Sequence, residues 1–266
     1  MRKTVSGVLA VAIVFGASAA AVAQQENRQD VQAGFTTKKP RTSTGFTTRI
    51  FYRDPADAEA KPRPVRNIVT IFPKGTKFDG GAVPVCEASD AELMSEGREA
   101  CPGASRIGGG RGTAITGVGM GVDPLRFDLT IFNAPGGIIL VASNQETGDT
   151  LAVNRGTQKG RTLTTPNPPT PGVPEEFQPA LREIEFTTDA RSSGGRNLTT
   201  TPAQCPRSGR LTTRFVFTYD DGATSSDRAT TPCTRTTRRP ISRRPRSRGR
   251  GIQRRNEQSQ DLRQTG

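Results

Sequence analysis

The chain has 266 residues and no histidine, which excludes Ser-His and Cys-His nucleophilic catalysis and every His-ligated metal site. It has no Trp and two Tyr but is rich in Gly, Pro and Thr, which is typical of strands and turns. The net charge is +13, of which the residues after Cys233 carry +9 (eleven Arg, one Glu, one Asp) and the leader +2, leaving the body from Gln24 to Cys233 nearly neutral.

Residues 1–23 have the organisation of a secretory signal peptide. Arg2 and Lys3 precede an apolar run, which ends in the small-residue motif Ala21-Val22-Ala23. We therefore expect a secreted or cell-envelope-associated protein, and the alternative is that the segment is kept as an N-terminal anchor. There is no Cys near the motif, so a lipid anchor is not expected. No later apolar run approaches the roughly 18 residues that span a bilayer.

The four cysteines are Cys86, Cys101, Cys205 and Cys233. In the oxidising compartment that export implies, we expect them to be paired rather than free. Four cysteines allow three connectivities, and pairing of nearest neighbours closes two short loops, each worth about 3 kcal/mol. A metal site is disfavoured because the chain lacks His and any C-x-x-C spacing, so no metal or cofactor is expected.

The first part of the chain predicts a flexible lead-in followed by two strands. Residues 24–44 are polar with few apolar positions, so order is expected to begin near Gly45. β-branched and aromatic residues then dominate 46–52 and 65–72, which we expect to be strands. The charged, Pro-rich stretch 54–64 between them predicts an exposed loop.

A short helix is predicted next. Ser89-Asp90-Ala91-Glu92 is a capping-box pattern, and Gly97 would end the helix. A Cys86–Cys101 bridge would close this segment into a loop. The glycines of 108–112 lack the Lys-Ser/Thr ending of a phosphate-binding loop, so they favour a bend or bulge in a strand.

The strongest strand pattern lies in the middle of the chain. Apolar residues alternate strictly over 125–132, a turn cluster follows at 133–137, and 138–142 is continuously apolar. This predicts a hairpin at the centre of the core. Five prolines within 165–174 predict a loop or linker over 164–179, which leaves open whether the body is one domain or two.

Strand patterns resume at 181–186 and 211–219, and Asp220-Asp221-Gly222 predicts a hairpin turn toward Cys233. Asp220, Asp221, Glu183 and Glu185 are the candidates for a two-carboxylate glycan hydrolase. A turn and the wet face of a strand explain them better, and the chain lacks the Trp platforms common in sugar sites. Asn197-Leu198-Thr199 matches a glycosylation acceptor, to which we attach no function.

Two groups of motifs resemble a module of secreted actinobacterial proteins that have no established activity. The first comprises Phe72-Pro73-Lys74-Gly75-Thr76-Lys77-Phe78, Pro84-Val85-Cys86, Ala91-Glu92-Leu93 and the stretch from Ala100 to Gly110; the second comprises Cys205-Pro206, the stretch from Phe215 to Gly222, and Pro232-Cys233. The resemblance spans most of 49–233. It implies export, β-structure and local disulfides, and it supplies no catalytic residue. The chain departs from the module at Arg210-Leu211, where an aromatic is expected.

Residues 234–266 predict a disordered basic tail, because arginine dominates and apolar residues are few. Its guanidinium groups are expected to bind polyanions, either anionic cell-wall polymers or lipid head groups. The alternative is a solvated extension without a dedicated partner. The tail lacks aromatics that stack on bases, so sequence-specific nucleic-acid recognition is not expected. The predicted polyanion-binding residues are Arg235, Arg238, Arg239, Arg243, Arg244, Arg246, Arg248, Arg250, Arg254 and Arg255.

Together these patterns predict an all-β protein with an antiparallel β-sandwich-like body over 45–233. The leading functional hypothesis is a non-enzymatic structural or binding protein outside the cytoplasm, held to anionic surface material by its tail. The alternatives are a secreted carboxylate-based glycan hydrolase and a protein–protein interaction module. The sequence defines neither a ligand nor an oligomeric state.

Overall fold

The computed structural model describes residues 28–116 and 124–234. The predicted signal peptide and the ten tail arginines therefore lie outside the described residues. The described part is built almost wholly of β-strands, with one α-helix, so the prediction of an all-β antiparallel fold is confirmed. No helix in this part is both long and apolar enough to cross a membrane.

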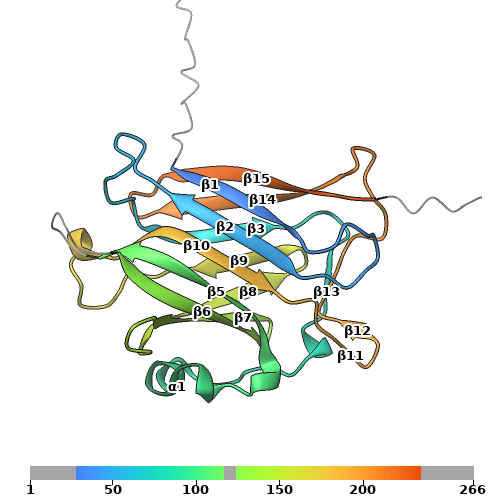
Figure 1. Cartoon of the computed structure of the whole chain (residues 1–266), viewed down its shortest axis with the longest axis horizontal. Helices are drawn as coiled ribbons and strands as arrows, with labels where there is room; N and C mark the ends of the chain where they lie inside the picture. Colours follow the sequence, from blue (N-terminus) through green and yellow to red (C-terminus); the bar gives the residue numbers. More distant parts are fainter. Residues whose placement is uncertain (1–27, 117–123, 235–266) are drawn as a thin grey trace, which may run out of the picture. The chain divides into compact units, whose positions relative to one another are not determined.

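Eleven strands form one sheet in which every neighbouring pair is antiparallel (Figure 1). In spatial order they are β1 (Gln29–Phe35), β2 (Phe46–Tyr52), β10 (Ala180–Thr188), β5 (Arg106–Ile115), β6 (Leu125–Ala134), β7 (Gly137–Asn144), β8 (Thr150–Lys159), β9 (Thr162–Pro166), β3 (Val65–Ile71), β14 (Arg210–Tyr219) and β15 (Thr224–Pro232). Two short ribbons pair β4 (Lys77–Phe78) with β13 (Thr199–Thr200) and β11 (Ser192–Ser193) with β12 (Arg196–Asn197).

The sheet curls until its two edge strands, β1 and β15, lie side by side (Figure 1). Side chains join them: the Phe35 amide donates to Thr231 Oγ1 over 2.9 Å. At the other end of β1, the Gln29 side-chain oxygen accepts from Tyr219 and Ser225. The two layers expected of a sandwich are thus halves of one sheet, and its exposed edges cover each other.

Glycines at two places let neighbouring strands approach closely. A Cβ on Gly110 of β5 would lie 2.0 Å from the Glu185 carbonyl oxygen on β10, and a Cβ on Gly137 of β7 would lie 1.8 Å from the Gly156 oxygen on β8. Only glycine permits such close approach of a neighbouring strand. The bulge predicted for 108–112 lies one step earlier: the register of β5 against β6 shifts between Arg106 and Gly108, and residues 108–112 pair without interruption with β6 and β10.

The interior holds two apolar clusters on the inner face of this curled sheet. One comprises inward residues of β1, β2, β3 and β14, with Phe215 and Phe217 at its centre. The other comprises inward residues of β5, β6 and β7, including Ile131 and Leu140. The predicted hairpin is confirmed as β6 and β7, and its continuous apolar run is buried on both faces because a third cluster covers the outside.

That outer cluster belongs to the loop that the predicted disulfide closes. Cys86 is bonded to Cys101, and the loop between them contains α1 (Asp90–Glu96), with the predicted capping box at Ser89 and Glu92. Leu93 of α1 is fully buried against the hairpin. The same region has short 3-10 helices at η1 (Gly80–Ala82), η2 (Gly97–Ala100) and η3 (Gly103–Ser105), and a fourth, η4 (Glu175–Phe177), lies in the proline-rich loop.

Two boundary predictions need correction. Residues 29–35, within the predicted flexible lead-in, form edge strand β1, because pairing with β2 and contact with β15 compensate for a polar sequence. The stretch 164–179 is not loop throughout, since Thr164, Thr165 and Pro166 belong to β9. Because β9 joins β8 to β3 in the sheet, this stretch does not divide the body into two domains.

Candidate functional site

Three segments that are distant in sequence meet at one end of the sheet: 36–45, 72–78 and 199–210. They contain no Asp or Glu. All their lysines and arginines are exposed, and we call these seven residues the basic end: Lys38, Lys39, Arg41, Lys74, Lys77, Arg207 and Arg210.

Backbone hydrogen bonds hold the three segments together. The Arg41 amide donates to the Pro202 carbonyl over 3.0 Å, and the Thr201 hydroxyl donates to the Lys39 carbonyl over 2.8 Å. Lys77 of β4 pairs with Thr200 of β13. These contacts fix the positions of the chain segments from which the cationic side chains project.

The second disulfide also ties this end. Cys205 is bonded to Cys233, and the next residue, Thr234, donates its amide to the Lys38 carbonyl over 2.8 Å. Thr234 is the last described residue, and the arginine-rich sequence follows it directly. Both disulfides join nearest neighbours, which is the pairing favoured from loop length. They are consistent with an oxidising compartment outside the cytoplasm.

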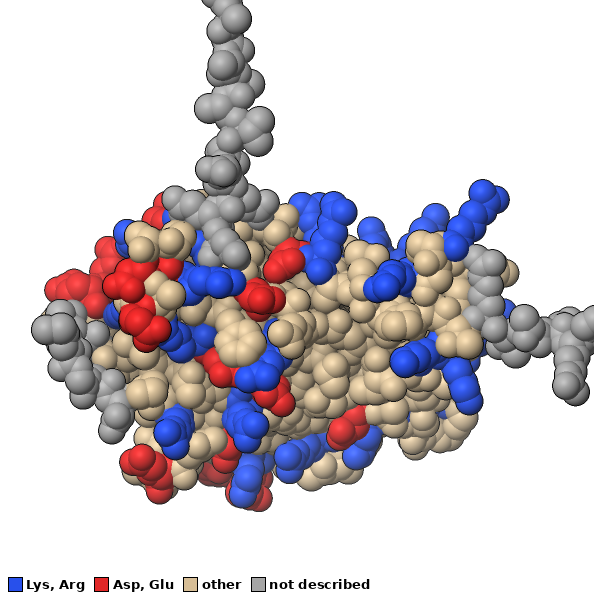
Figure 2. All heavy atoms as spheres, turned by 45° about the horizontal axis from the view of Figure 1, so that its top comes forward, with Lys and Arg blue, Asp and Glu red and all other residues tan. Residues whose placement is uncertain are grey.

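Acidic residues gather at the opposite end of the sheet. The loops 53–64 and 144–149, helix η4 and the β14–β15 turn together contain nine Asp and Glu against three Lys and Arg. Figure 2 shows this separation, with red gathered toward the left end and blue over the right. The net charge of the body is therefore near zero although its two ends carry charges of opposite sign. The sequence signal that reveals the basic end is the absence of acids from its three segments.

The acid nearest the basic end in sequence is already neutralised. Asp79 accepts hydrogen bonds from Nε of Arg196, at 2.7 Å, and from Nη2 of the same residue. These hydrogen bonds hold the pKa of the Asp79 carboxyl below its usual value. The carboxylate stays ionised and engaged by its own arginine. It is thus not available to neutralise the lysines nearby.

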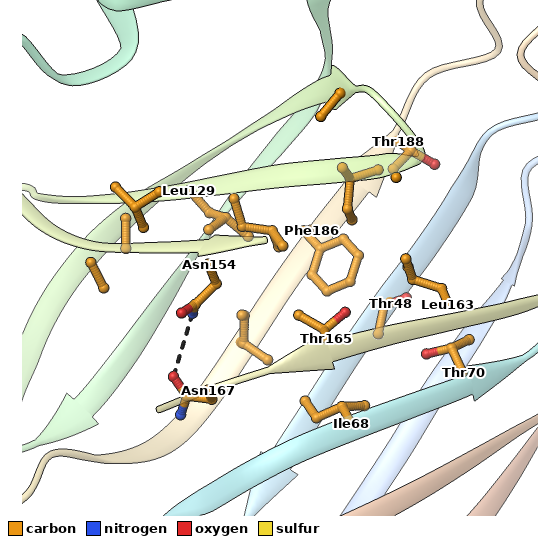
Figure 3. Close-up of a pocket in the computed structure, with 18 of the residues that line it drawn as sticks. Thr48, Ile68, Thr70, Leu129, Asn154, Leu163, Thr165, Asn167, Phe186 and Thr188 are labelled. Carbon is orange, nitrogen blue, oxygen red and sulfur yellow. Dashed lines mark hydrogen bonds between the residues drawn. The ribbon is translucent and has the colours of Figure 1, made fainter. Parts of the chain in front are cut away.

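A hollow of about 1020 Å³ opens into the interior between the two inner clusters (Figure 3). Its wall includes Ile68 and Leu163 on one side and Ile184 and Phe186 on the other. These four apolar side chains are only partly buried, although they lie on inward faces of strands. Packed sheets normally fill the space between them, so the hollow is an unusual feature of this interior.

Small residues on β8 account for part of this space. By register, Ala152, Asn154 and Gly156 face inward beside Ala142, Leu140 and Ile138 of β7. A Cβ on Gly156 would lie 2.9 Å from Ile138 and 3.1 Å from Leu163. Glycine at this position leaves the neighbouring side chains in place around the hollow.

Three of the four carboxylates considered for glycan hydrolysis are paired with arginines. Glu183 and Glu185, on the outer face of β10, both pair with Arg49, at 2.7 and 3.7 Å. Asp221 lies in the predicted turn and accepts from Arg28 at 2.8 Å, which lowers the pKa of its carboxyl. A lowered pKa makes Asp221 unsuited to act as the general acid of a glycosidase.

Asp220 faces a second, smaller hollow of about 450 Å³ at the acidic end. Glu175 and Glu176 line the same hollow with Lys61 and Arg63. Oδ1 of Asp220 is buried without a hydrogen-bond partner in the described part of the chain. The carboxylate-based glycan hydrolase stays an untested alternative.

The fold and these two features define a disulfide-bonded, antiparallel β protein with a basic end and an apolar hollow. No family model and no curated protein matches the chain. The chain is similar to the N-terminal domain of the Streptococcus gordonii adhesin Sgo0707, with 10% sequence identity and a TM-score of 0.33. The match covers 79% of this chain and 33% of that one. The resemblance to secreted actinobacterial proteins therefore stays a prediction.

Proposed function

We propose that this is an exported, non-enzymatic binding protein that attaches to an anionic polymer through its basic end together with the arginine-rich tail. The separation of charge on the folded body carries the proposal. A group of cations on three segments that contain no Asp or Glu raises the local potential and attracts anions. The tail would add its own arginines to this attachment.

The composition of the basic end favours a polymer over a membrane surface. Its three segments consist mainly of Lys, Arg, Thr, Ser, Pro and Gly. The exposed large apolar residues of the described part, Met94, Leu151 and Phe177, all lie elsewhere. A face without large exposed apolar side chains gains little from the lipid–water boundary, whereas hydroxyls and cations suit phosphate or carboxylate groups in water.

The test measures binding to polyphosphate across a range of salt concentrations. The triple variant Lys38→Gln/Lys39→Gln/Arg41→Gln is compared with Arg63→Gln/Arg111→Gln/Arg126→Gln, which removes the same charge from exposed positions elsewhere. We expect the first variant to lower the slope of log affinity against log salt by about 2 units, at roughly 0.7 per charge, and the control to lower it less.

A second comparison separates the body from the tail. A chain ending at Thr234 should keep part of the affinity, and this remainder should vanish in the first triple variant. Equal slopes for the two triple variants would refute the role of the basic end. Retention on anionic vesicles but not on polyphosphate would instead make the partner a lipid head group.

A further inference from the structure

The hollow inside the sheet has the properties of a binding site for a small molecule. Its volume of about 1020 Å³ lies at the upper end of ligand pockets, which range over roughly 300–1,000 Å³. Its walls come from strands that belong to one hydrogen-bonded sheet, so they cannot simply collapse together. The apolar wall residues would lose their remaining exposure if an apolar molecule filled the space.

Polar side chains are spread over the wall, and Thr48, Thr70 and Thr188 lie apart from a pair of amide side chains near the end of β9 (Figure 3). Nδ2 of Asn154 lies 3.4 Å from Oδ1 of Asn167, and both side chains point into the hollow (Figure 3). The Asn167 amide donates to the Arg66 carbonyl over 2.8 Å, which fixes Asn167 beside Arg66. The wall is thus mainly apolar, with single polar side chains spread over it and one pair of amides beside Arg66.

Charge on the wall is confined to two residues, Arg66 and Asp90. Asp90 is paired with Arg155 at 2.7 Å. Arg66 is half-buried and forms no ion pair within the described ranges. A half-buried guanidinium on the wall of an apolar hollow is suited to a carboxylate.

From this arrangement we infer that the hollow binds an anionic amphiphile of the fatty-acid class. The hydrocarbon chain lies between the walls formed by Ile68, Leu163 and Phe186. The carboxylate lies at Arg66. The amide groups of Asn154 and Asn167 already donate one hydrogen bond each, to Asn167 Oδ1 and to the Val65 carbonyl, and the second N–H of each serves the carboxylate. This site is distinct from the basic end, and it is independent of the proposed attachment to a polymer.

The first experiment tests whether the hollow is occupied. The secreted protein is titrated with a fluorescent polyene fatty acid below its micelle-forming concentration, and emission is followed. Ala142→Phe, which projects a ring into the hollow from β7, should abolish saturable binding. Thr47→Phe adds the same ring on the exposed face of β2 and should leave binding unchanged. Both variants keep the tail, so fatty acid held by the tail does not alter the comparison.

The second experiment tests the head group. The parent should bind the acid at least about tenfold more tightly than its methyl ester, which is the factor expected for one charge-assisted hydrogen-bonded contact. Arg66→Gln should remove that preference, and Arg66→Lys should restore part of it. Thermal melting and circular dichroism establish that each variant is folded.

Each result has a defined reading. The proposed fatty-acid site is refuted if the parent binds neither the acid nor the ester. It is also refuted if a folded Ala142→Phe variant binds as the parent does. Equal affinity of the parent for acid and ester overturns the carboxylate assignment, as does an unchanged preference in Arg66→Gln.

Discussion

At the residue scale, one buried amide connects the core to the disulfide loop. Asn133, at the end of β6, is 2% exposed. Its Nδ2 lies within hydrogen-bond distance of the carbonyl oxygens of Gly80, Val83 and Pro84, at 2.8 to 3.1 Å. Buried carbonyls need such partners, because leaving them unpaired costs free energy. This side chain therefore holds the segment that leads to Cys86 against the hairpin.

Replacing this residue should be costly. Asn133→Asp substitutes a carboxylate oxygen for the donor and places it against three carbonyls, and we expect the free energy of unfolding to fall by about 3 kcal/mol or more. Chemical denaturation measures the change. Asn144→Asp, in the β7–β8 turn, is the control, because Oδ1 of Asn144 is the acceptor for the Glu146 amide and an aspartate keeps that role. Similar losses of unfolding free energy in the two variants would contradict the structural role given to Asn133.

At the scale of elements, closure of the sheet depends on contacts between strands from the two ends of the chain. Arg28 precedes β1, and Asp221 lies in the turn between β14 and β15, so their ion pair joins the two edges. The side chains are 15% and 29% exposed, which places the pair between a surface and a buried salt bridge. The hydrogen bonds of Gln29 lie alongside it.

This pair predicts a pH-dependent contribution to stability. Because the hydrogen bond from Arg28 lowers the pKa of Asp221 in the folded state, its stabilisation is present above the unfolded-state pKa and is lost as pH falls through the folded pKa. Asp221→Asn should therefore cost about 1 kcal/mol at neutral pH and almost nothing at a pH below the folded pKa. Urea melts at several pH values measure this difference. A cost that does not change with pH would contradict it.

The two disulfides are expected to differ in function. Each closes a short loop and contributes about 3 to 4 kcal/mol on the chain-entropy model. Only Cys205–Cys233 lies at the basic end. Replacing both cysteines of this bridge with Ser should weaken polyphosphate binding as well as stability, whereas the same change at Cys86 and Cys101 should affect stability alone. Equal binding by two folded double variants would show that the bridge does not organise the basic end.

At the scale of the whole molecule, the separation of charge gives the body a preferred orientation on a polyanion. The basic end would face the polymer, and the acidic loops at the other end would be repelled from it. Neither effect appears in the net charge of the body, which is small because the two ends nearly cancel.

Lysine footprinting tests this orientation. Added polyphosphate should slow acetylation of Lys38, Lys39, Lys74 and Lys77 and leave the rate at Lys61, which lies at the acidic end, nearly unchanged. Each lysine serves as its own reference with and without polymer, so differences in burial do not matter. Uniform protection of all five would indicate binding through the tail without a fixed orientation of the body.

The sequence by itself determined the features that depend on neighbours along the chain. Alternation over 125–132 predicted β6, the capping box predicted α1, and loop length favoured the disulfide pairs that the structure contains. Each rests on local geometry or on the entropy of closing a short loop. Each of these patterns lies within a few tens of residues along the chain.

Only the tertiary structure decided the features that depend on distant segments. β1 has a polar sequence and becomes a strand because it pairs with β2 and is contacted by β15. The basic end forms because three acid-free loops meet, and the hollow forms because small residues of β8 face partly buried apolar residues of β3, β9 and β10. Curling of the sheet brings these residues together, and no pattern along the chain specifies which faces will meet across an interior.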